Sequence, residues 1–248
     1  NVTSDTPWGG GHLLVDNLAR FDLLNFDHFR QFSTISVLCP GGPTEQEAFF
    51  LNALMPPNVR VMAVPKDTLY EPDQCLVNTF VTSRSSGYLR GPYVERLRAR
   101  LGLTPPGHAT ERILISRRHA SRRRIQNEDE LLTALRPLGF QRCVAEDLAL
   151  ADQIALFSHA EAIIAPHGAG LSHLLFAPQA RVLELFASPY VVPHYYLLAK
   201  SLGQPYAYLT GTQPHHDDDF TVNVDAAVRS VRELLASSRP NAPSSRPS

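Results

Sequence analysis

Apolar and polar positions along this chain alternate between two patterns. Short continuous apolar runs bounded by proline, glycine or charged residues, such as AIIA at 162–165, are typical of strands buried in a parallel sheet. Between them, apolar residues recur every three or four positions, which predicts amphipathic helices. Strands that alternate with helices predict a parallel sheet with helical crossovers, so the expected fold class is α/β. We expect strands at 35–39, 59–64, 75–81, 112–116, 142–145, 162–165, 181–186 and 206–209, and helices at 12–29, 44–54, 93–101, 127–138, 150–160, 171–176, 194–202 and 224–236.

One series of alternating strands and helices precedes residues 103–108 and a second series follows them, which predicts two domains. Residues 103–108, LTPPGH, combine two prolines with a glycine and are the best candidate linker. We therefore expect one α/β domain over 1–108 and a second over 109–236, each of ordinary domain size. Residues 237–248 are Ser, Arg, Pro, Asn and Ala only, which predicts a disordered tail.

Composition limits the class of protein without identifying it. The 248 residues are 44% hydrophobic and 19% charged, with a formal net charge of −1, so the chain is ordinary for a globular protein and no nucleic-acid partner is implied. No apolar run reaches about 18 residues, so no membrane span is expected in this stretch. Cys39, Cys75 and Cys143 lack metal-site and disulfide spacing and predict buried free thiols. The chain begins at Asn1, so either a leader has been removed or the sequence is a fragment.

The segment EAIIAPHGAGLSHLLF at 161–176 carries the first candidate chemistry. Its apolar run ends at Pro166, Gly168 and Gly170 follow within four residues, and apolar positions then return at helical spacing. This predicts a strand, a tight turn and a helix start whose amides, beside His167, can receive an anion such as a nucleotide diphosphate. A plain glycine turn with a structural histidine accounts for the same residues, because short glycine motifs are weak signals.

Five arginines follow the strand predicted at 112–116. They lie in RRHASRRR, residues 117–124, a loop at the carboxyl end of a strand, where ligands bind in open α/β sheets. Guanidinium groups make paired contacts with phosphate oxygens, so the loop suits a diphosphate. A solvated basic loop and an RNA-binding patch are the alternatives, and the near-neutral net charge and the absence of interleaved aromatic residues disfavour RNA. Because both phosphate-compatible loops follow strands of the same unit, their conjunction favours one shared site.

Three further features are weaker by themselves. Glu184, near the end of the strand at 181–186, is placed where an acid can hydrogen-bond ribose hydroxyls, and it needs an arginine or a ribose as partner if it is buried. His12 and Asp16 share a helix face, where the acid can orient the imidazole, although a solvated helix cap explains the pair equally simply. The loop HHDDD at 215–219 reads as a solvated run rather than a metal site.

Taken together, several segments resemble glycosyltransferase family 61. They are ISRRHASRRRIQNEDEL at 115–131, GF at 139–140, AEDLALADQIALFSHAEAIIAPHGAGLSHLLF at 145–176 and VLELF at 182–186, which match the family in order and spacing. More thinly, GGHLLVDNLARFDLL at 10–24 is similar to the family's H-x-x-x-D helix, without the tyrosine and tryptophan that commonly flank that histidine.

The resemblance implies a GT-B-like architecture, in which two Rossmann-like domains face a cleft. The N-terminal domain would lie on the acceptor side, and the C-terminal domain would bind a nucleotide sugar, with no metal or other cofactor required. The family includes plant xylosyl- and arabinosyltransferases, protein N-acetylglucosaminyltransferase-like members and bacterial capsular polysaccharide biosynthesis proteins. The implied function is therefore inverting transfer of a sugar from a nucleotide-sugar donor, expected to be UDP-linked, to a polysaccharide or protein glycan acceptor.

The family's motifs also imply a role for each matching residue. Arg117 and Arg124 would hold the diphosphate. Charge on the leaving group would be shared by His167 and the amides of the glycine turn, Gly168, Ala169 and Gly170. Glu184 would bind the ribose, and Asn127, Glu128 and Gln153 would line or brace the site. His12 or Asp16 would accept the proton of the acceptor hydroxyl.

Two other functions fit parts of the same pattern. One is a different α/β enzyme that acts on a phosphorylated substrate, which the lack of G-x-G-x-x-G after an early strand disfavours. The other is a non-catalytic α/β nucleotide-binding module that keeps the pocket without the transfer chemistry. The expected location is the cytoplasm for a bacterial protein, or the Golgi or endoplasmic reticulum lumen for a fragment of a eukaryotic one.

Overall fold

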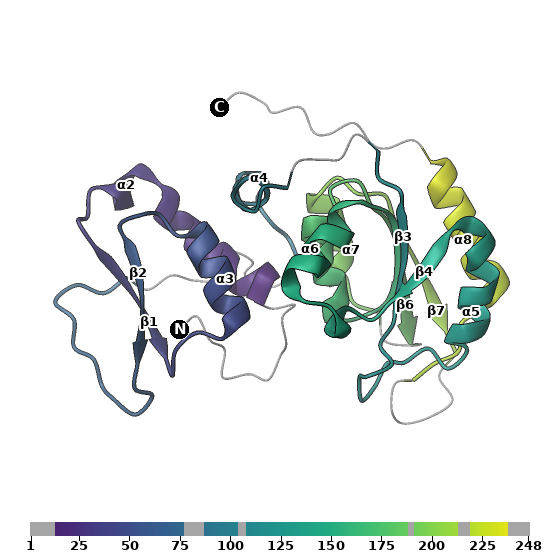
Figure 1. Ribbon diagram of the computed structural model, residues 1–248, viewed down its shortest axis with the longest axis horizontal. Helices are drawn as coiled ribbons and strands as arrows, with labels where there is room; N and C mark the ends of the chain where they lie inside the picture. Colours follow the sequence, from purple (N-terminus) through teal and green to yellow (C-terminus); the bar gives the residue numbers. More distant parts are fainter. Residues whose placement is uncertain (1–12, 77–86, 104–107, 188–190, 213–218, 238–248) are drawn as a thin grey trace.

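Two separate parallel sheets organise the protein (Figure 1). The computed structural model describes residues 13–76, 87–103, 108–187, 191–212 and 219–237. In the N-terminal half, β1 (Ile35–Pro40) pairs with β2 (Val59–Val64). The larger sheet has the order β4-β3-β5-β6-β7, with all neighbours parallel, so the predicted α/β class is confirmed. Its strands are β3 (Glu111–Ile115), β4 (Phe140–Cys143), β5 (Ala160–Pro166), β6 (Arg181–Ala187) and β7 (Tyr206–Gly211).

The helical segments of the N-terminal half differ in regularity. The prediction of one helix over 12–29 is wrong, because its described part divides into three segments, and the apolar residues Leu18, Phe21 and Leu24 recur at the period of three that suits a 3-10 helix. By contrast, the helix expected at 44–54 is regular and begins with a capping box, in which the Thr44 hydroxyl accepts from the Glu47 amide at 3.2 Å. The segments are η1 (Leu13–Asn17), η2 (Leu18–Asn25), α2 (Asp27–Arg30), α3 (Glu45–Leu54) and α4 (Gly91–Arg100).

Two predicted strands need correction. The strand expected at 75–81 is not seen at Cys75 and Leu76, and its remaining positions lie outside the described residues. The strand expected at 142–145 is β4 instead, which begins two residues earlier. Gly139 ends the preceding helix in a left-handed conformation, with φ of 81°, so the chain enters the sheet at once.

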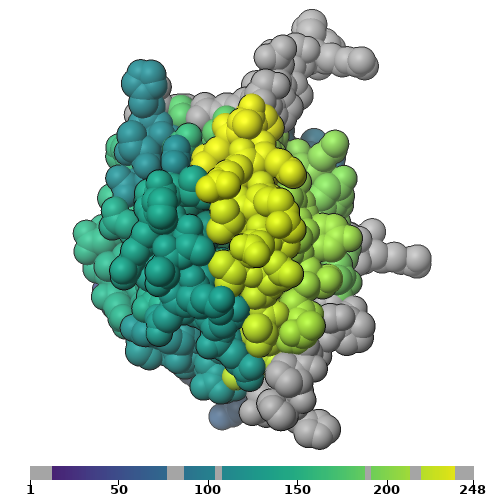
Figure 2. Space-filling model, turned by 90° about the vertical axis from the view of Figure 1, so that its right-hand side faces the viewer, coloured from purple at the N-terminus to yellow at the C-terminus, as the bar shows by residue number. Residues whose placement is uncertain are grey.

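Helices cover both faces of the larger sheet. On the outer face, α5 (Glu128–Leu135) and α8 (Val224–Ala236) lie side by side (Figure 2), and they bury leucines and valines against β3, β5 and β6. On the other face lie α6 (Leu150–Ser158), the 3-10 helix η5 (Ala169–Phe176) and α7 (His194–Ser201). Two short 3-10 turns, η3 (Arg136–Leu138) and η4 (Ala145–Asp147), flank β4. Because both faces are buried, the strands read as continuous apolar runs.

The two halves of the chain share one apolar core. The cluster that covers the inner face of the larger sheet continues without a break into η1, η2, α3 and α4. At its centre the rings of Phe50, on α3, and Phe176, on η5, stack with centroids 6.0 Å apart. Helix α4 lies between the halves (Figure 1), and Arg98 donates from Nε to the carbonyl of Leu175 at 3.0 Å. The buried Arg98 guanidinium has its pKa lowered to about 10 by loss of hydration.

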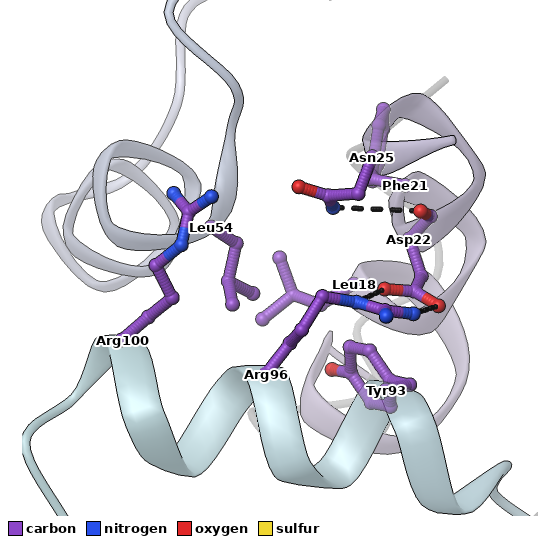
Figure 3. Close-up of a pocket in the computed structure, with 8 residues that line it drawn as sticks. All are labelled: Leu18, Phe21, Asp22, Asn25, Leu54, Tyr93, Arg96 and Arg100. Atoms are coloured by element: carbon purple, nitrogen blue, oxygen red, sulfur yellow. Dashed lines mark hydrogen bonds and ion pairs between the residues drawn. The ribbon is translucent and has the colours of Figure 1, made fainter. Parts of the chain in front are cut away.

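A second junction ties α4 to η2 (Figure 3). Arg96 makes a paired contact with Asp22, at 2.7 Å from Nε and 2.5 Å from Nη2. The hollow beside this pair, lined also by Leu18, Leu54 and Arg100, measures about 10 Å³. That volume is at the lower limit for a single water molecule, so this is a packed polar contact and not a ligand site.

Two observations bear on the remaining sequence predictions. Cys39 and Cys143 are buried free thiols as predicted, but Cys75 is exposed, so the prediction of three buried thiols is wrong for that residue. In the described part of the chain, no helix combines the length and the apolar character needed to cross a membrane.

Candidate functional site

The strand order of the larger sheet places a topological switch point between β3 and β5, and we call the space outside the carboxyl ends of these two strands the crevice. Numbered within this sheet alone, the order is 2-1-3-4-5, which is a doubly wound arrangement. The chain leaves β3 toward α5 on one face and leaves β5 toward η5 on the other, so the two connections diverge. Ligands of open α/β sheets bind outside the carboxyl ends of strands at such a point. The residues that follow these two strands are the arginine loop and the glycine turn.

The arginine loop and the glycine turn touch at Arg117 and Gly168. A β-carbon built on Gly168 would lie 2.2 Å from Nη1 of Arg117, so the guanidinium occupies the space that any other side chain would need. The prediction that the two loops meet is therefore confirmed. Loss of hydration lowers the pKa of Arg117, and the positive charge of Arg123 lowers it further, while Glu146 acts in the opposite direction. A cation in this setting is suited to bind an anion.

The turn itself supplies backbone donors. Helix η5 begins at Ala169, and its first closing hydrogen bond runs from the Leu171 amide to the Gly168 carbonyl at 3.0 Å. The amides of Ala169 and Gly170 precede that bond, at the end of the helix where the first amides lack a partner within the helix. A β-carbon on Gly170 would lie 3.0 Å from the side chain of Ile115, which keeps the turn close to the end of β3.

His167 is held by a buried carboxylate. Its Nδ1 lies 2.6 Å from Oε1 of Glu184, and because an ionised carboxylate only accepts, Nδ1 is the donor. The second carboxylate oxygen accepts from the Tyr206 hydroxyl at 2.5 Å. The imidazole also stacks on Phe186, with ring centroids 5.2 Å apart. The histidine ring is therefore fixed in tautomer and orientation at the mouth of the crevice.

The location predicted for Glu184 is wrong. It lies in the middle of β6, opposite Tyr208 of β7, and it is fully buried on the face that carries η5 and α7. The partner that its burial requires is neither an arginine nor a ribose, since His167 and Tyr206 take its two oxygens. Its geometry is that of a residue that positions His167.

Arg124 does not join Arg117. Its Nε and Nη2 lie 2.8 and 2.7 Å from Oδ2 of Asp219, and its amide donates to Oδ1 at 2.8 Å. The structure thus brings Arg117 to the glycine turn and His167 to Glu184, and it pairs Arg124 with Asp219 instead; the ligand-binding roles expected of these residues stay predictions. The charge of the adjacent Arg123 acts on both Arg117 and Tyr195, in the direction that lowers the pKa of each.

Tyr195 is a site residue that the sequence did not indicate. It lies in the first turn of α7, with its ring centroid 5.5 Å from that of His167. Burial raises the pKa of its phenol, and the charge of Glu184 raises it further, so the hydroxyl stays protonated and can donate. Asp16, buried in η1, also raises this pKa, which places an acid of the N-terminal half near the same crevice. Nothing in the sequence HYY at 194–196 distinguishes this tyrosine, because its place depends on how α7 packs.

Asn127 and Glu128, two of the predicted donor-site residues, hold the start of α5 by hydrogen bonds and an ion pair. Asn127 exchanges hydrogen bonds with the backbone of Val222, at 2.9 and 3.0 Å, and ties the start of α5 to the segment before α8. Glu128 accepts from Ser116 at 3.0 Å and pairs with Arg142 at 2.8 Å.

Gln153 links two of the loops through a histidine. It donates to the carbonyls of Ala145 and Leu148, and its oxygen lies 2.6 Å from Nε2 of His173. The other nitrogen of His173 lies 2.8 Å from the Gly170 carbonyl, so Gln153 is connected to the glycine turn. The bracing role predicted for Gln153 agrees with this geometry.

Two sequence predictions fall partly outside the described residues. His12 lies there, so its side chain is not placed relative to Asp16. Most of the 215–219 loop also lies there, and its last residue, Asp219, is paired with Arg124. Among the residues that are described, no three His, Cys, Asp or Glu side chains gather in a way that could hold a metal ion.

Comparison with known proteins places this site in a named family. The family model "Glycosyltransferase 61" matches residues 11–183, which include the arginine loop, the glycine turn and Asp16.

The chain is also similar to EGF domain-specific O-linked N-acetylglucosamine transferases. It is 37% identical to the mouse protein over 95 residues, which are 35% of this chain and 18% of that protein. The Drosophila melanogaster protein is 37% identical over 93 residues, 36% of this chain and 18% of that protein. The chimpanzee protein, from Pan troglodytes, is 32% identical over 111 residues, 42% of this chain and 21% of that protein. The chain thus covers about a fifth of the length of these relatives.

Proposed function

The chain belongs to glycosyltransferase family 61, and from this premise we propose that it transfers a sugar from a nucleotide-sugar donor to a hydroxyl group of a glycan or protein. One observation carries the proposal, namely the contact of Arg117 with Gly168 at the point where the connections after β3 and β5 diverge. A cation and the first amides of a helix there face one crevice, and this combination binds phosphate groups. We further propose a GT-B-like division into an acceptor-side domain over 1–108 and a donor domain over 109–236.

The site would act mainly on the leaving group. As the bond between the anomeric carbon and the phosphate oxygen breaks, its electron pair moves to the diphosphate, which gains negative charge. Arg117, the amides of Ala169 and Gly170, and the hydroxyl of Tyr195 are placed to stabilise that charge. His167, oriented by Glu184, would add a donor at Nε2 when the imidazole is protonated.

The acceptor would react from the side of the N-terminal half. Its oxygen bonds to the anomeric carbon opposite the leaving group, which inverts the configuration, and its proton passes to a base. Asp16 is the described candidate, because it reaches the surroundings of Tyr195 from η1. His12 is the second candidate, one helical turn earlier in the sequence.

The first donor to test is suggested by the relatives. The names of the mouse and Drosophila melanogaster proteins describe O-linked transfer of N-acetylglucosamine. We therefore propose UDP-N-acetylglucosamine as the first donor, with other UDP-sugars as comparisons, and hydroxyl-bearing glycans and protein domains as acceptors. The arginines supply counter-charge to the diphosphate, which supports transfer without a metal ion.

The first prediction concerns donor binding without metal. We expect UDP at 100 times its Kd, with EDTA present, to stabilise the protein by about 2.7 kcal/mol, which raises the Tm by roughly 5 to 10 °C. Thermal scans with UDP and several UDP-sugars, with EDTA or with Mg²⁺, measure this. The absence of any shift with UDP or UDP-sugars would reject the donor site, and a shift only with Mg²⁺ would reject metal independence.

Product formation separates an enzyme from a binding module. Radiolabelled UDP-N-acetylglucosamine is incubated with a panel of hydroxyl acceptors, and the parent chain is compared with Asp16→Asn. Transfer that is lost in Asp16→Asn, with UDP affinity unchanged, would support the base assignment. Binding of UDP without transfer to any acceptor would favour the non-catalytic module.

A further inference from the structure

Arg123 has an unusual backbone conformation within the arginine loop. Its φ is 61°, and over the described ranges it is the single residue other than glycine with a positive φ. The β-carbon of an arginine disfavours this left-handed region, and such residues persist where the surrounding structure imposes them, often at functional sites.

The next residues impose this conformation. Arg124 is fixed to Asp219 through its amide and its guanidinium, and its carbonyl accepts from the Phe220 amide at 3.1 Å. Ile125 then forms a parallel bridge with Phe220. The end of the loop is therefore fastened to the segment before α8, and the chain must turn sharply just before it. Arg123 lies in a left-handed conformation directly before this fixed end, and its charge acts on Arg117 and Tyr195.

In the crevice Arg123 and Arg117 form a pair of like charges. Each is without an ion pair within the described part of the chain, and Nε of Arg123 is buried without a hydrogen-bond partner there. Nε of Arg117 has only a long contact with the Arg122 carbonyl, at 3.4 Å. The charges of both guanidinium groups act on Tyr195, and the repulsion between the two groups is lowered when an anion lies between them.

We propose that Arg123, and not Arg124, is the second arginine that binds the diphosphate of the donor. This inference rests on the proposed function and assigns the residues that contact the phosphates of the donor. Arg117 and Arg123 bind the diphosphate, while Arg124 binds Asp219 and thereby holds the end of the loop. The binding of the uncharged parts of the nucleotide, such as the base and the ribose, does not depend on Arg123.

Two neighbouring substitutions test the assignment. Arg123→Gln weakens UDP binding about 10- to 100-fold, because hydrogen bonds to a charged group are lost, and leaves the Kd of uridine unchanged. Arg124→Gln changes the Kd of UDP less than about threefold but lowers the Tm, since it breaks the contact with Asp219. Titration calorimetry with UDP, uridine and inorganic pyrophosphate measures the Kd values, and a thermal scan measures the Tm. The reverse pattern, with Arg124→Gln impaired and Arg123→Gln normal, overturns the proposal.

Arg123→Gly separates ligand binding from folding. Glycine adopts the left-handed conformation readily, and its introduction also removes a buried unpartnered donor. The variant is therefore at least as thermally stable as the parent chain in the absence of ligand, and yet it binds UDP as weakly as Arg123→Gln. A fall in Tm with unchanged UDP affinity would show that Arg123 is structural and overturn the proposal.

Pyrophosphate distinguishes this inference from the proposed function. If the parent chain binds pyrophosphate but not UDP, the nucleotide-sugar function fails, and loss of pyrophosphate binding in Arg123→Gln still supports the arginine pair. If UDP binds equally well to the parent chain and to Arg123→Gln, the arginine pair fails and the function stands. If neither ligand binds the parent chain, both are rejected.

Discussion

At the scale of single residues, the site depends on the absence of a side chain as much as on charged groups. Gly168 leaves room for the Arg117 guanidinium, and Gly170 lets the turn approach Ile115. The φ of Gly168 is 162°, which is extended backbone that any residue adopts. Gly168 is therefore required for space and not for conformational freedom, so its substitution should affect the ligand site rather than folding.

Gly168→Ala provides the test of this spatial requirement. The added methyl group meets the end of a flexible side chain, so we expect Arg117 to move aside, the Kd of UDP to rise about tenfold and the Tm to change by only a few degrees. Gly91→Ala is the matched control, since a β-carbon there meets nothing within 4 Å. Unchanged UDP affinity in Gly168→Ala would show that Arg117 does not need this position.

At the scale of elements, Asp219 helps to hold the far end of the loop after β3. Asp219 binds the amide and the guanidinium of Arg124. Burial alone would raise the pKa of Asp219, but the hydrogen bonds and charge of Arg124 together outweigh it and hold the pKa below its usual range. This contact connects the arginine loop to the segment that leads into α8.

The lowered pKa of Asp219 predicts a pH dependence of stability. A carboxylate whose pKa is lower in the folded state stabilises the protein above its unfolded value, and this contribution is lost as the pH falls from about 5 through the folded pKa. We expect Asp219→Asn to reduce the free energy of unfolding near pH 6 and to match the parent chain more closely near pH 3. Urea titrations across this range measure the difference. Asp152→Asn, at an exposed position, is the control, and an equal loss at both pH values would contradict the linkage.

At the scale of the whole molecule, the two sheets are separate but the core is shared. The predicted boundary at 103–108 falls between the sheets, yet Phe50 of the first half stacks on Phe176, which ends the helix of the glycine turn. Asp16 comes close to Tyr195 in the same way. Packing between the halves therefore supports the element that carries the site.

This shared core predicts that the described halves unfold together. Phe50→Ala removes a fully buried ring and should cost about 3 to 5 kcal/mol, with one transition seen by both far-ultraviolet and near-ultraviolet circular dichroism. Phe49→Ala, at the neighbouring exposed position, should cost much less. Two separate transitions, of which Phe50→Ala shifts one, would show that the halves fold independently.

The sequence by itself determined the order of elements and the loops that carry the chemistry. Alternating apolar runs, glycines, prolines and the Thr44 cap are local signals, and strands that follow one another in a parallel sheet bring their carboxyl ends to one edge. The meeting of the arginine loop and the glycine turn followed from that rule alone. The resemblance to family 61 rested on the same local segments, and the family match bears it out.

Only the tertiary structure decided which side chains enter the crevice. Arg123 and Arg124 are adjacent and chemically identical, but Arg124 pairs with Asp219, 95 residues later, while Arg123 takes a left-handed φ and its charge acts on Arg117. For Glu184 the sequence shows where a strand lies but not its register against β5 and β7, which brings His167 and Tyr206 to its carboxylate. Such contacts depend on packing between distant segments, and no local pattern of residues encodes them.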